Sequence, residues 1–517
     1  MLRVVALLLG LLAFSNGPAL SETYYVAPLD AVVNGTPDGT EGLPFLSIDA
    51  ALKSGKMKGG DTLLLKDGAY GSVTIKTNAA FDVPVTIMSQ NAKAAHFDDI
   101  LLALDTRNLI LRNLSVWPRN PATGSAYLVR TYDTVSNITV DGLDVRSEEG
   151  AGDYLKWDAA KWNARKFSGI VLEGTHNLVT NSRLTGVYHG IAVGEDSKII
   201  DNIVDGFNGD GIRAYSRSVV RGNRISNCVI TDDNHDDGFQ SFSVNGKPVT
   251  GLVIDSNIII EWTGEDDHSL RCTLQGIGLF DGFYDNLTIV NNVVSVTHAH
   301  GISVLGARGA KIFNNTVVNR LGLTGKYPYI AVYPHRDGPV STDVLVANNV
   351  ATSFQGIASA TDRIEFRNNS VIGIPSLVFE NPTAFDYRPK ASSGFIDTGD
   401  TTVAPATDVM GQKRPSGPLP DRGAYEVQVA APPVDTGVEP PESPVGAPIA
   451  PPIRTPNTPT TGETTTTTGE TTTTIISSGG SKRIRITSGA SKKIETGSGG
   501  SKRVVLFKRS PFGIKKH

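Results

Sequence analysis

The chain has 517 residues, enough for a large core and more than one segment, and a formal net charge of −4 at pH 7. Its only two cysteines, Cys228 and Cys272, exclude a metal site built from cysteines alone. The charge is unevenly distributed. Residues 481–517 carry eleven basic side chains and one acid, a net of +10, whereas the rest of the chain carries 37 basic and 51 acidic side chains, a net of −14.

The N-terminal segment, MLRVVALLLGLLAFSNGPALSE, predicts a secretory signal peptide over residues 1–21. Arg3 precedes an apolar run, Val4 to Phe14, that is too short to span a membrane comfortably; an uncleaved anchor is the alternative. No other segment reads as a membrane span. We therefore expect a secreted protein, extracellular or periplasmic, with no transmembrane segment in the mature chain. In such a protein the two cysteines can pair, although their spacing does not decide it.

A repeat occupies the middle of the chain. Short strands rich in Val and Ile recur every 20 to 23 residues, with three insertions of about a dozen residues. This period predicts a β-solenoid, whereas a leucine-rich repeat would need a leucine skeleton that this sequence lacks. Segments at Asn108 and Asn137 look like looser, earlier copies. The copies align on a column of asparagines, which we expect to be structural: Asn181, Asn202, Asn223, Asn257, Asn292, Asn315, Asn349 and Asn369.

A second column has the form X-Gly-apolar. In three coils, X lies eight residues after the aligned asparagine. Stacked coils place such residues in a line, about 4.7–4.9 Å apart, and the resulting polar groove suits a linear polymer. The X residues are Ser168, His189, Asp210, Asp237, Gln275, His300 and Gln355.

These features resemble the right-handed parallel β-helix (pectin-lyase-like) superfamily, in its carbohydrate-active branch. YYVAP and LPFLSIDAALKSGKMKGGDTLLLKDGAY are similar to the N-terminal cap and first coil of such proteins, and SSGFIDTGD with RGAYEV resembles a closing segment. The resemblance implies an all-β fold, a right-handed parallel β-helix over residues 22–427 with a capping helix from Pro44 to Ser54. It specifies no activity.

The composition changes after Val427. Residues 428–476 are rich in Pro and Thr and predict an extended linker, and residues 477–517 form a basic low-complexity tail in which SGGSKR-like units recur. We expect both to be disordered. A cationic tail could contact an anionic surface in a salt-sensitive way, and nothing in the sequence indicates specific binding of nucleic acid.

The stretch TDDNHDDGFQ, residues 231–240, lies at the centre of the second column. His189, Asp210 and the Asp236–Asp237 pair fall on three consecutive coils, so like charges raise one another's proton affinity and acid/base chemistry becomes available. NGDGI, HDDGF and AHGIS resemble motifs of polygalacturonases, which implies that the three aspartates hydrolyse a glycosidic bond with His300 as a helper. Gln275 lies where those enzymes have the histidine, and their Arg-Ile-Lys motif is missing.

A calcium site is the other interpretation of the same acids, with Asp210, Asp232, Asp233, Asp236 and Asp237 as oxygen ligands. NHDDGFQSF resembles the acidic strand of family 9 polysaccharide lyases, which implies β-elimination, and a C5-epimerase shares the same proton abstraction. Those lyases use a lysine from the next coil, which LQGIGLF lacks. Their base would have to be one of Arg213, His189, His235, His268 or Lys247.

The insertions supply candidate walls and sugar-stacking aromatics for the groove. The candidate substrate-binding residues are Gln240, Gln275, His268, Arg271, Trp262 and Tyr329. The sequence thus predicts a secreted enzyme that modifies an acidic, uronic-acid polysaccharide by β-elimination or C5 epimerisation with calcium. The alternatives are a polygalacturonase-like hydrolase that uses Asp210, Asp236 and Asp237, and a β-helix that binds carbohydrate or a surface without catalysis.

Overall fold

The computed structural model describes residues 21–76, 81–121, 126–322, 327–338, 340–356, 359 and 361–429, together with the backbone of three strands between 463 and 486. The chain divides into two units, Met1–Pro432 and Pro433–His517. The predicted signal peptide lies almost wholly outside the described residues. Within them, no helix combines the length and apolarity that crossing a membrane requires.

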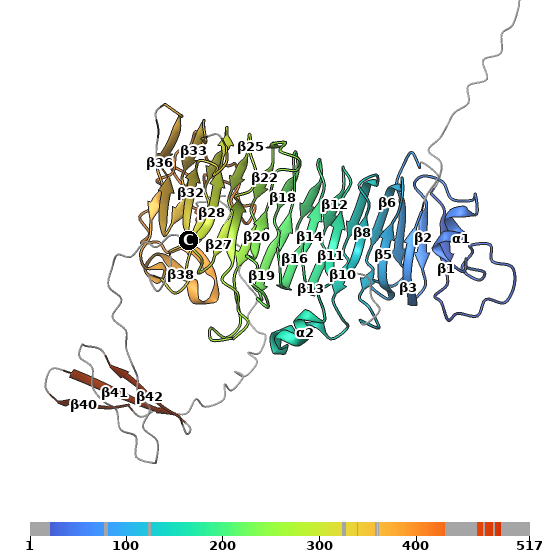
Figure 1. Cartoon of the computed structure of the whole chain (residues 1–517), viewed down its shortest axis with the longest axis horizontal. Coiled ribbons are helices and arrows are strands. Elements are labelled where there is room, and N and C mark those ends of the chain that lie inside the picture. The colour runs from blue at the N-terminus through green and yellow to red at the C-terminus, as the bar shows by residue number, and fades with distance from the viewer. Residues whose placement is uncertain are drawn as a thin grey trace, which may run out of the picture. The chain divides into compact units, whose positions relative to one another are not determined.

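The first unit is a stack of coils in which every strand pairs in parallel with its counterpart on the next coil (Figure 1). The strands form three ladders. The first ladder comprises β1 Thr23–Val26, β2 Thr62–Leu65, β4 Val85–Ser89, β6 Arg107–Arg112, β9 Ser136–Asp141, β12 Leu178–Thr180, β15 Lys198–Ile200, β18 Val219–Arg221, β22 Val253–Asp255, β26 Thr288–Val290, β30 Lys311–Phe313, β33 Val344–Ala347 and β36 Ile364–Arg367.

The second ladder comprises β7 Ser115–Val116, β10 Asp144–Arg146, β13 Arg183–Val187, β16 Ile203–Phe207, β19 Arg224–Cys228, β23 Ile258–Ile260, β27 Val293–Ser295, β31 Thr316–Val318, β34 Val350–Ala351 and β37 Ser370–Val371. The third comprises β3 Gly68–Ile75, β5 Ala95–Leu102, β8 Tyr127–Thr131, β11 Ser168–Leu172, β14 Ile191–Val193, β17 Ile212–Arg213, β20 Asp237–Gln240, β24 Gln275–Leu279, β28 His300–Leu305, β32 Tyr329–Tyr333 and β35 Ser353–Gly356.

Shorter elements decorate the solenoid. A small parallel ladder follows the third one, and an antiparallel pair lies near the C-terminal end. These elements are β21 Val249–Thr250, β25 Tyr284–Asp285, β29 Ala307–Arg308, β38 Phe379–Asn381, β39 Asp386–Pro389, α1 Ile48–Lys53, η1 Ala151–Lys156, α2 Ala159–Asn163, α3 Pro375–Val378 and η2 Pro382–Ala384.

The interior explains the repeat. Apolar residues of the first-ladder strands point inward, as Ile199, Val220, Ile254 and Ile289 do, and these side chains are buried. A single coil cannot bury its apolar face, so stacking is what removes it from water. β-branched residues suit these short buried parallel strands.

The turn between the first and second ladders contains the asparagine column, with one correction to the predicted alignment. Each buried amide oxygen accepts the backbone N–H of the preceding coil, as Asn292 does from Asn257 at 2.9 Å. The residue bonded to Asn202 in this way is Ser182, not Asn181. Asn181 occupies the preceding left-handed position, with φ of 52°, and is exposed. Asparagine tolerates both positions, and adjacent Asn pairs in later copies hid the one-residue offset.

The segments at Asn108 and Asn137 are confirmed as earlier copies of the repeat, because their strands β6 and β9 belong to the first ladder. Both asparagines lie within these strands, with positive φ, and not in the turn that contains the asparagine column. The capping helix is confirmed as α1, shorter than Pro44–Ser54, because Ser47 Oγ accepts the N–H of Ala50 and begins the helix at Ile48.

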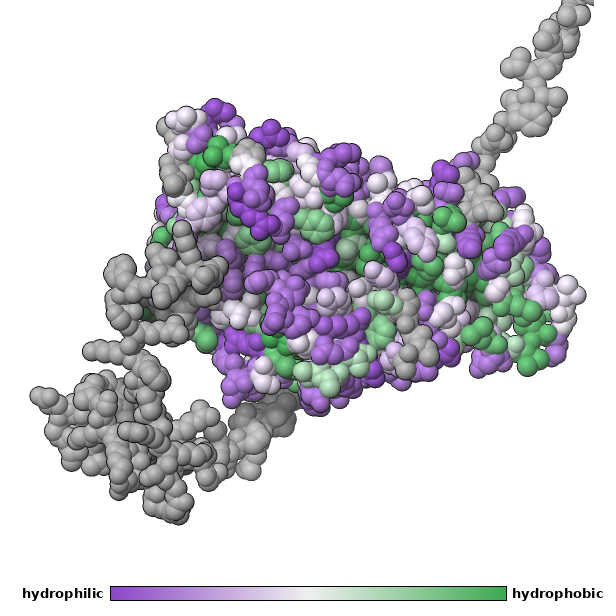
Figure 2. All heavy atoms as spheres, in the orientation of Figure 1, coloured by the Kyte–Doolittle hydropathy of each residue, from purple (hydrophilic) through white to green (hydrophobic). Residues whose placement is uncertain are grey.

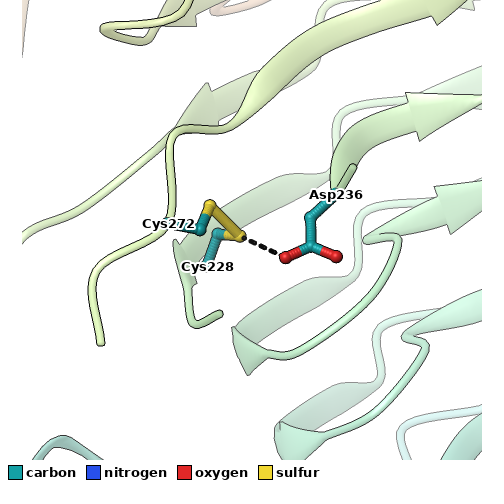
Figure 3. A group of neighbouring side chains, drawn as sticks. All are labelled: Cys228, Asp236 and Cys272. Carbon is teal, nitrogen blue, oxygen red and sulfur yellow. Dashed lines mark hydrogen bonds between the residues drawn. A yellow bond between two sulfur atoms is a disulfide. The ribbon is translucent and has the colours of Figure 1, made fainter. Parts of the chain in front are cut away.

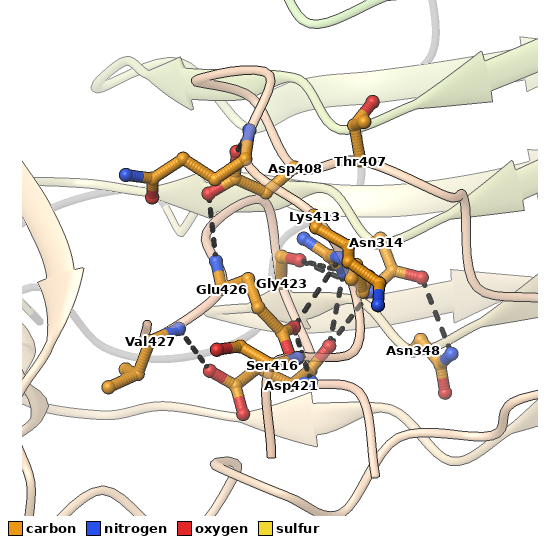
Figure 4. Close-up of polar contacts among 12 residues, drawn as sticks. Asn314, Asn348, Thr407, Asp408, Lys413, Ser416, Asp421, Gly423, Glu426 and Val427 are labelled. Carbon is orange, nitrogen blue, oxygen red and sulfur yellow. Dashed lines mark hydrogen bonds and ion pairs between the residues drawn. The ribbon is translucent and has the colours of Figure 1, made fainter. Parts of the chain in front are cut away.

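A polar network attaches the C-terminal segment to the side of the last coils. The buried Arg414 donates to the backbone carbonyls of Asp421 and Ala424 and pairs with Glu426 at 3.5 Å. Asn314, from the turn after β30, donates to the carbonyl of Asp421 at 2.9 Å. Figure 4 shows Asn314, Asp421 and Glu426 within this network. The first unit therefore holds its C-terminal segment against the turns of its last coils.

In the second unit the structure describes the backbone of three strands that pair in an antiparallel sheet: β40 Glu463–Thr468, β41 Thr471–Ser478 and β42 Ser481–Ile486. Runs of Thr and Ile have high strand propensity. The remainder of residues 430–517, including most of the basic tail, lies outside the described residues.

Candidate active site

The X-Gly-apolar column lies where the strands of the third ladder begin. The N–H of Gly190 donates to the carbonyl of Asp210, and the N–H of Gly211 donates to that of Asp237. Asp237 is in register with Gln275 on β24. The predicted line of His189, Asp210, Asp237 and Gln275 is therefore confirmed, with Ser168 before it and His300 after it. The glycine in each copy leaves no room for a side chain, since a Cβ at Gly211 would lie 2.7 Å from the carbonyl oxygen of Gly238.

Asp210 is the paired member of the acid cluster. Its Oδ2 accepts from Arg213 Nε at 2.6 Å, and its Oδ1 accepts from the backbone N–H of Asp237 at 3.0 Å. Burial raises its pKa, and Arg213 with that N–H opposes the rise. Among the clustered acids, Asp210 is thus the best placed to stay ionised. Arg213 holds its proton in this ion pair, which rules it out as a base.

Asp237 is buried with one oxygen unsatisfied. Its Oδ2 accepts from Gln240 Nε2 at 3.2 Å, while its Oδ1 has no hydrogen-bond partner among the described residues. Gly278, on the next coil, permits this position, because a Cβ there would lie 2.2 Å from Oδ1. Gln275 Oε1 is also buried and unpartnered within the described part of the chain. Burial, followed by the charges of Asp210 and Asp236, holds the pKa of Asp237 well above its usual value.

Asp236 lies against the disulfide that joins Cys228 and Cys272 (Figure 3). Its Oδ2 is 3.4 Å from Cys228 Sγ, and Asn234 Nδ2 donates to its Oδ1 at 3.3 Å. A disulfide sulfur carries no hydrogen and can only accept, so this contact favours a protonated carboxyl. Burial and the nearby charges of Asp210 and Asp232 raise the pKa of Asp236 to about 8.

His189 is neutral and its base nitrogen is engaged. The backbone N–H of Asp210 donates to His189 Nδ1 at 3.0 Å. Burial, with the charge of Arg213, lowers the pKa of His189 to about 4. The sequence prediction of His189 as a candidate proton acceptor is therefore wrong in this conformation, and its role is to hold the backbone at Asp210.

Two insertions flank β20, the strand that carries Asp237. The one before it is tied to the segment after α2, because Lys166 pairs with Asp232 at 2.7 Å and Thr231 bonds Asn163 at 2.9 Å. The one after it is a hairpin closed by a bridge between Val244 and Lys247. On the face shown in Figure 2, hydrophilic side chains gather over the half of the solenoid that contains β20 and β28, whereas apolar ones are more frequent toward α1.

The structure does not assemble the five predicted calcium ligands. Asp232 is bound by Lys166, and Asp233 is exposed. Within the described residues, no three of the five aspartates bring oxygens within 4.8 Å of one another; the group that does so is Asp236 with the two bonded cysteines. The full five-carboxylate set therefore does not fit a calcium ion, since such an ion needs about six to eight converging oxygens.

His300 and Tyr329 continue the column beyond Gln275. Tyr329 Oη lies 2.7 Å from His300 Nδ1, and Ser303 Oγ lies 2.8 Å from the same nitrogen. The imidazole stacks on His298, with ring centres 5.1 Å apart. Gln275 lies on the coil between His300 and Asp237, so His300 is two coils, about 9–10 Å, from that carboxylate. His300 can contact a long ligand but not the same atom as Asp237.

Three predicted substrate-binding residues are structural. Trp262 is 1% exposed in a cluster with Trp157 and Trp162, and its indole N–H donates to the carbonyl of Glu265. Arg271 donates to Glu261 and Asp266. His268 contacts the carbonyl of Leu155 through Nε2. The prediction for Trp262 is wrong because its side chain is buried, and Arg271 and His268 are engaged by contacts of the insertions rather than placed along the column.

The sequence prediction also missed residues beside the acids. Tyr215 and Phe242 each follow a column residue by five positions, and their rings lie 5.3 Å apart. The equal spacing from Asp210 and Asp237 was the available signal. Of the remaining candidate bases, His235 is exposed in the insertion before β20, and Lys247 is exposed in the hairpin after it.

Comparison with known proteins supports the architecture. Residues 168–371 match the family model described as the right-handed beta helix region. Among solved structures, pectate lyase Pel9A is 17% identical, with 78% of this chain and 96% of that one covered and a TM-score of 0.40. The A-module of mannuronan C-5 epimerase AlgE4 from Azotobacter vinelandii is 13% identical, with coverages of 68% and 96% and a TM-score of 0.43.

The catalytic unit of an alpha-1,3-glucanase from Streptomyces thermodiastaticus is 14% identical, with coverages of 69% and 70% and a TM-score of 0.35. At these identities the likeness does not extend to activity. No curated protein matches the sequence. The family match and the three parallel ladders together establish that the chain has the fold of the right-handed parallel β-helix proteins.

Proposed function

We propose that this protein is a polysaccharide-modifying enzyme that hydrolyses glycosidic bonds of an acidic polymer bound along the third ladder. The observation that carries the proposal is the cluster of Asp210, Asp236 and Asp237, three buried carboxyls on adjacent coils, of which Asp210 is paired with a cation, Arg213. Burying that much negative charge is costly unless a proton or a cation neutralises it. A cluster that keeps a proton at neutral pH while Asp210 stays ionised is what acid/base hydrolysis requires.

The chemical step follows from the protonation states of the three carboxyls. Asp236, with its pKa of about 8, donates a proton to the glycosidic oxygen as the bond from that oxygen to the anomeric carbon breaks. Water adds to the anomeric carbon and gives its proton to an ionised carboxylate of the cluster, which restores the starting charge. Gln240 and Arg213, the more exposed members, contact the two other aspartates and lie where a substrate would meet them.

A second candidate function, β-elimination or C5 epimerisation with calcium, is favoured by a separate observation. Asp237 Oδ1 and Gln275 Oε1 are neighbouring buried acceptors without partners in the described residues, and a cation would satisfy both. It is the weaker candidate, because Arg213 and His189, the two candidate bases that contact Asp210, are engaged by it. A β-helix that only binds carbohydrate is the third possibility.

The deciding experiment follows products from a panel of uronic-acid polymers, with and without a chelator. We expect new reducing ends, no ultraviolet absorbance from an unsaturated product, and no effect of the chelator. Asp237→Asn should lower turnover by about 10²–10⁴-fold. Asp255→Asn, which removes a carboxylate paired with Arg221 on the first ladder, is the matched control and should leave turnover unchanged.

Chelator-sensitive ultraviolet absorbance would replace hydrolysis with calcium-dependent elimination. Binding with no product and no change in uronate epimer content would show that the protein binds carbohydrate without catalysis.

A further inference from the structure

A pocket opens beside the acid cluster, under the hairpin that follows β20. Its volume is about 150 Å³, and Tyr215, Phe242 and Lys247 line it together with Glu195 and Pro248. The coil from β20 to β22 is longer here than the preceding one from β17 to β18, and the extra residues form this hairpin. The enlargement thus occurs on the coil that carries Asp237.

Arg213 links the pocket to the acids. Its Nε donates to Asp210 Oδ2 at 2.6 Å, and its guanidinium carbon lies 6.0 Å from the centre of the Phe242 ring. Tyr215 and Phe242 follow Asp210 and Asp237 by five residues each, and both lie two residues beyond the paired ends of β17 and β20. A ligand that reaches the acids can therefore extend over Arg213 into the pocket without leaving these two coils.

The lining has a definite chemistry. The half-buried rings of Tyr215 and Phe242 provide an apolar wall, and Lys247 is exposed at the rim. Glu195, the acid in the lining, is paired at 2.6 Å with Arg217, which it shares with Asp196. A small pocket with an aromatic wall and a cation at its edge suits a single ring that carries a negative charge.

We propose that this pocket is a subsite for one uronate residue of the polymer, with the sugar ring against Phe242 and its carboxylate at Lys247. The proposal rests on the function proposed above and adds a determinant of substrate class. The acid cluster itself repels anions, so an acidic polymer needs a cation nearby to be preferred over a neutral one. Lys247 and Arg213 stand on the side of the cluster that the pocket occupies.

The test separates binding from turnover. In an Asp237→Asn background, calorimetry at low salt measures the binding of a short oligogalacturonate, a short oligomannuronate and their carboxyl-reduced, neutral counterparts. We expect Lys247→Gln to weaken the tighter acidic oligomer about tenfold and to leave its neutral counterpart unchanged. Phe242→Ala should weaken both forms. Lys311→Gln, an exposed lysine on β30 of the first ladder, is the matched control and should change neither.

Equal affinity of the parent and the Lys247→Gln protein for the acidic oligomer would overturn the subsite, as would no binding of any oligomer at millimolar concentration. Because Lys247 is exposed, its substitution should not unfold the protein, and unchanged thermal unfolding verifies this. If the wild type showed no turnover while Lys247→Gln lost only acidic binding, the subsite would stand and the hydrolase would fall. If the wild type showed turnover and Lys247→Gln had no effect on binding, the hydrolase would stand and the subsite would fall.

Discussion

At the residue scale, the notable feature is how differently three neighbouring aspartates are solvated. Asp210 is held by Arg213 and a backbone N–H, Asp237 has one oxygen without a partner in the described residues, and Asp236 rests on a disulfide sulfur. Environments that push the pKa values of like groups apart are how one site obtains both an acid and a base. The raised pKa of Asp236 also makes the stability of the fold depend on pH.

We expect Asp236 to make the protein less stable as pH rises. Its folded pKa, about 8, is above its ordinary value, so between about pH 4 and 8 the folded chain holds a proton that the unfolded chain has released. Stability from this group is complete below pH 4 and is lost as pH rises toward 8. Urea unfolding at pH 5 and pH 8 should show Asp236→Asn gaining on the wild type at the higher pH.

Asp255→Asn is the control for that comparison, because it removes a carboxylate from the first ladder. An advantage of Asp236→Asn that shrinks as pH rises would contradict the raised pKa.

At the element scale, the turns stabilise the solenoid together with the strands. From Asn202 onward, the coils bend through a left-handed residue such as Asn291, followed by a buried asparagine such as Asn292. The amide of Asn292 donates to the carbonyls of Ile254 and Val290 and to the amide oxygen of Asn315. The column thus satisfies backbone groups that the bend would otherwise bury unpaired.

Removing one amide should therefore cost more than an ordinary surface change. We expect Asn292→Ala to lower the free energy of unfolding by roughly 2–4 kcal/mol, because it leaves several buried donors and acceptors without partners. Asn181→Ala, at the exposed position that the sequence placed in the same column, should cost well under half as much. Chemical denaturation of both proteins measures the difference, and similar losses would show that the column does not carry this stability.

At the scale of the whole molecule, segments outside the repeat pack against the solenoid near both of its ends. Capping helix α1 covers the first coil, and the segment that contains Arg414, Asp421 and Glu426 packs against the turns of the last coils. The second unit begins only after this segment. The active-site column lies in the middle, where coils on both sides hold its register.

We expect a chain that ends after Pro432 to unfold at the same temperature as the full chain and to retain its turnover. A chain that ends after Asp400 lacks the network of Arg414 and should unfold at a markedly lower temperature, because the turn residues Asn291 and Asn314 lose their partners. If the basic tail contacts anionic surfaces, only the full chain should be retained by an anionic resin at low salt and released as salt rises. Loss of thermal stability on ending at Pro432 would contradict this division.

The sequence by itself determined the architecture of this protein. A repeat of 20 to 23 residues, a turn residue of restricted type and an X-Gly-apolar column are local patterns, and a solenoid converts local patterns into structure because each coil contacts only its neighbours. The line of His189, Asp210, Asp237 and Gln275 followed from the same regularity, apart from the one-residue offset at Asn181.

Only the tertiary structure decided what surrounds that line. The insertions depart from the repeat, so their packing is set by contacts between segments distant in sequence, which buried Trp262 and engaged Arg271. The same contacts placed Asp236 on the disulfide and opened the pocket at Phe242. Protonation follows burial and neighbouring charge, both of which are properties of the folded chain, so the sequence could name the acids but could not assign their states.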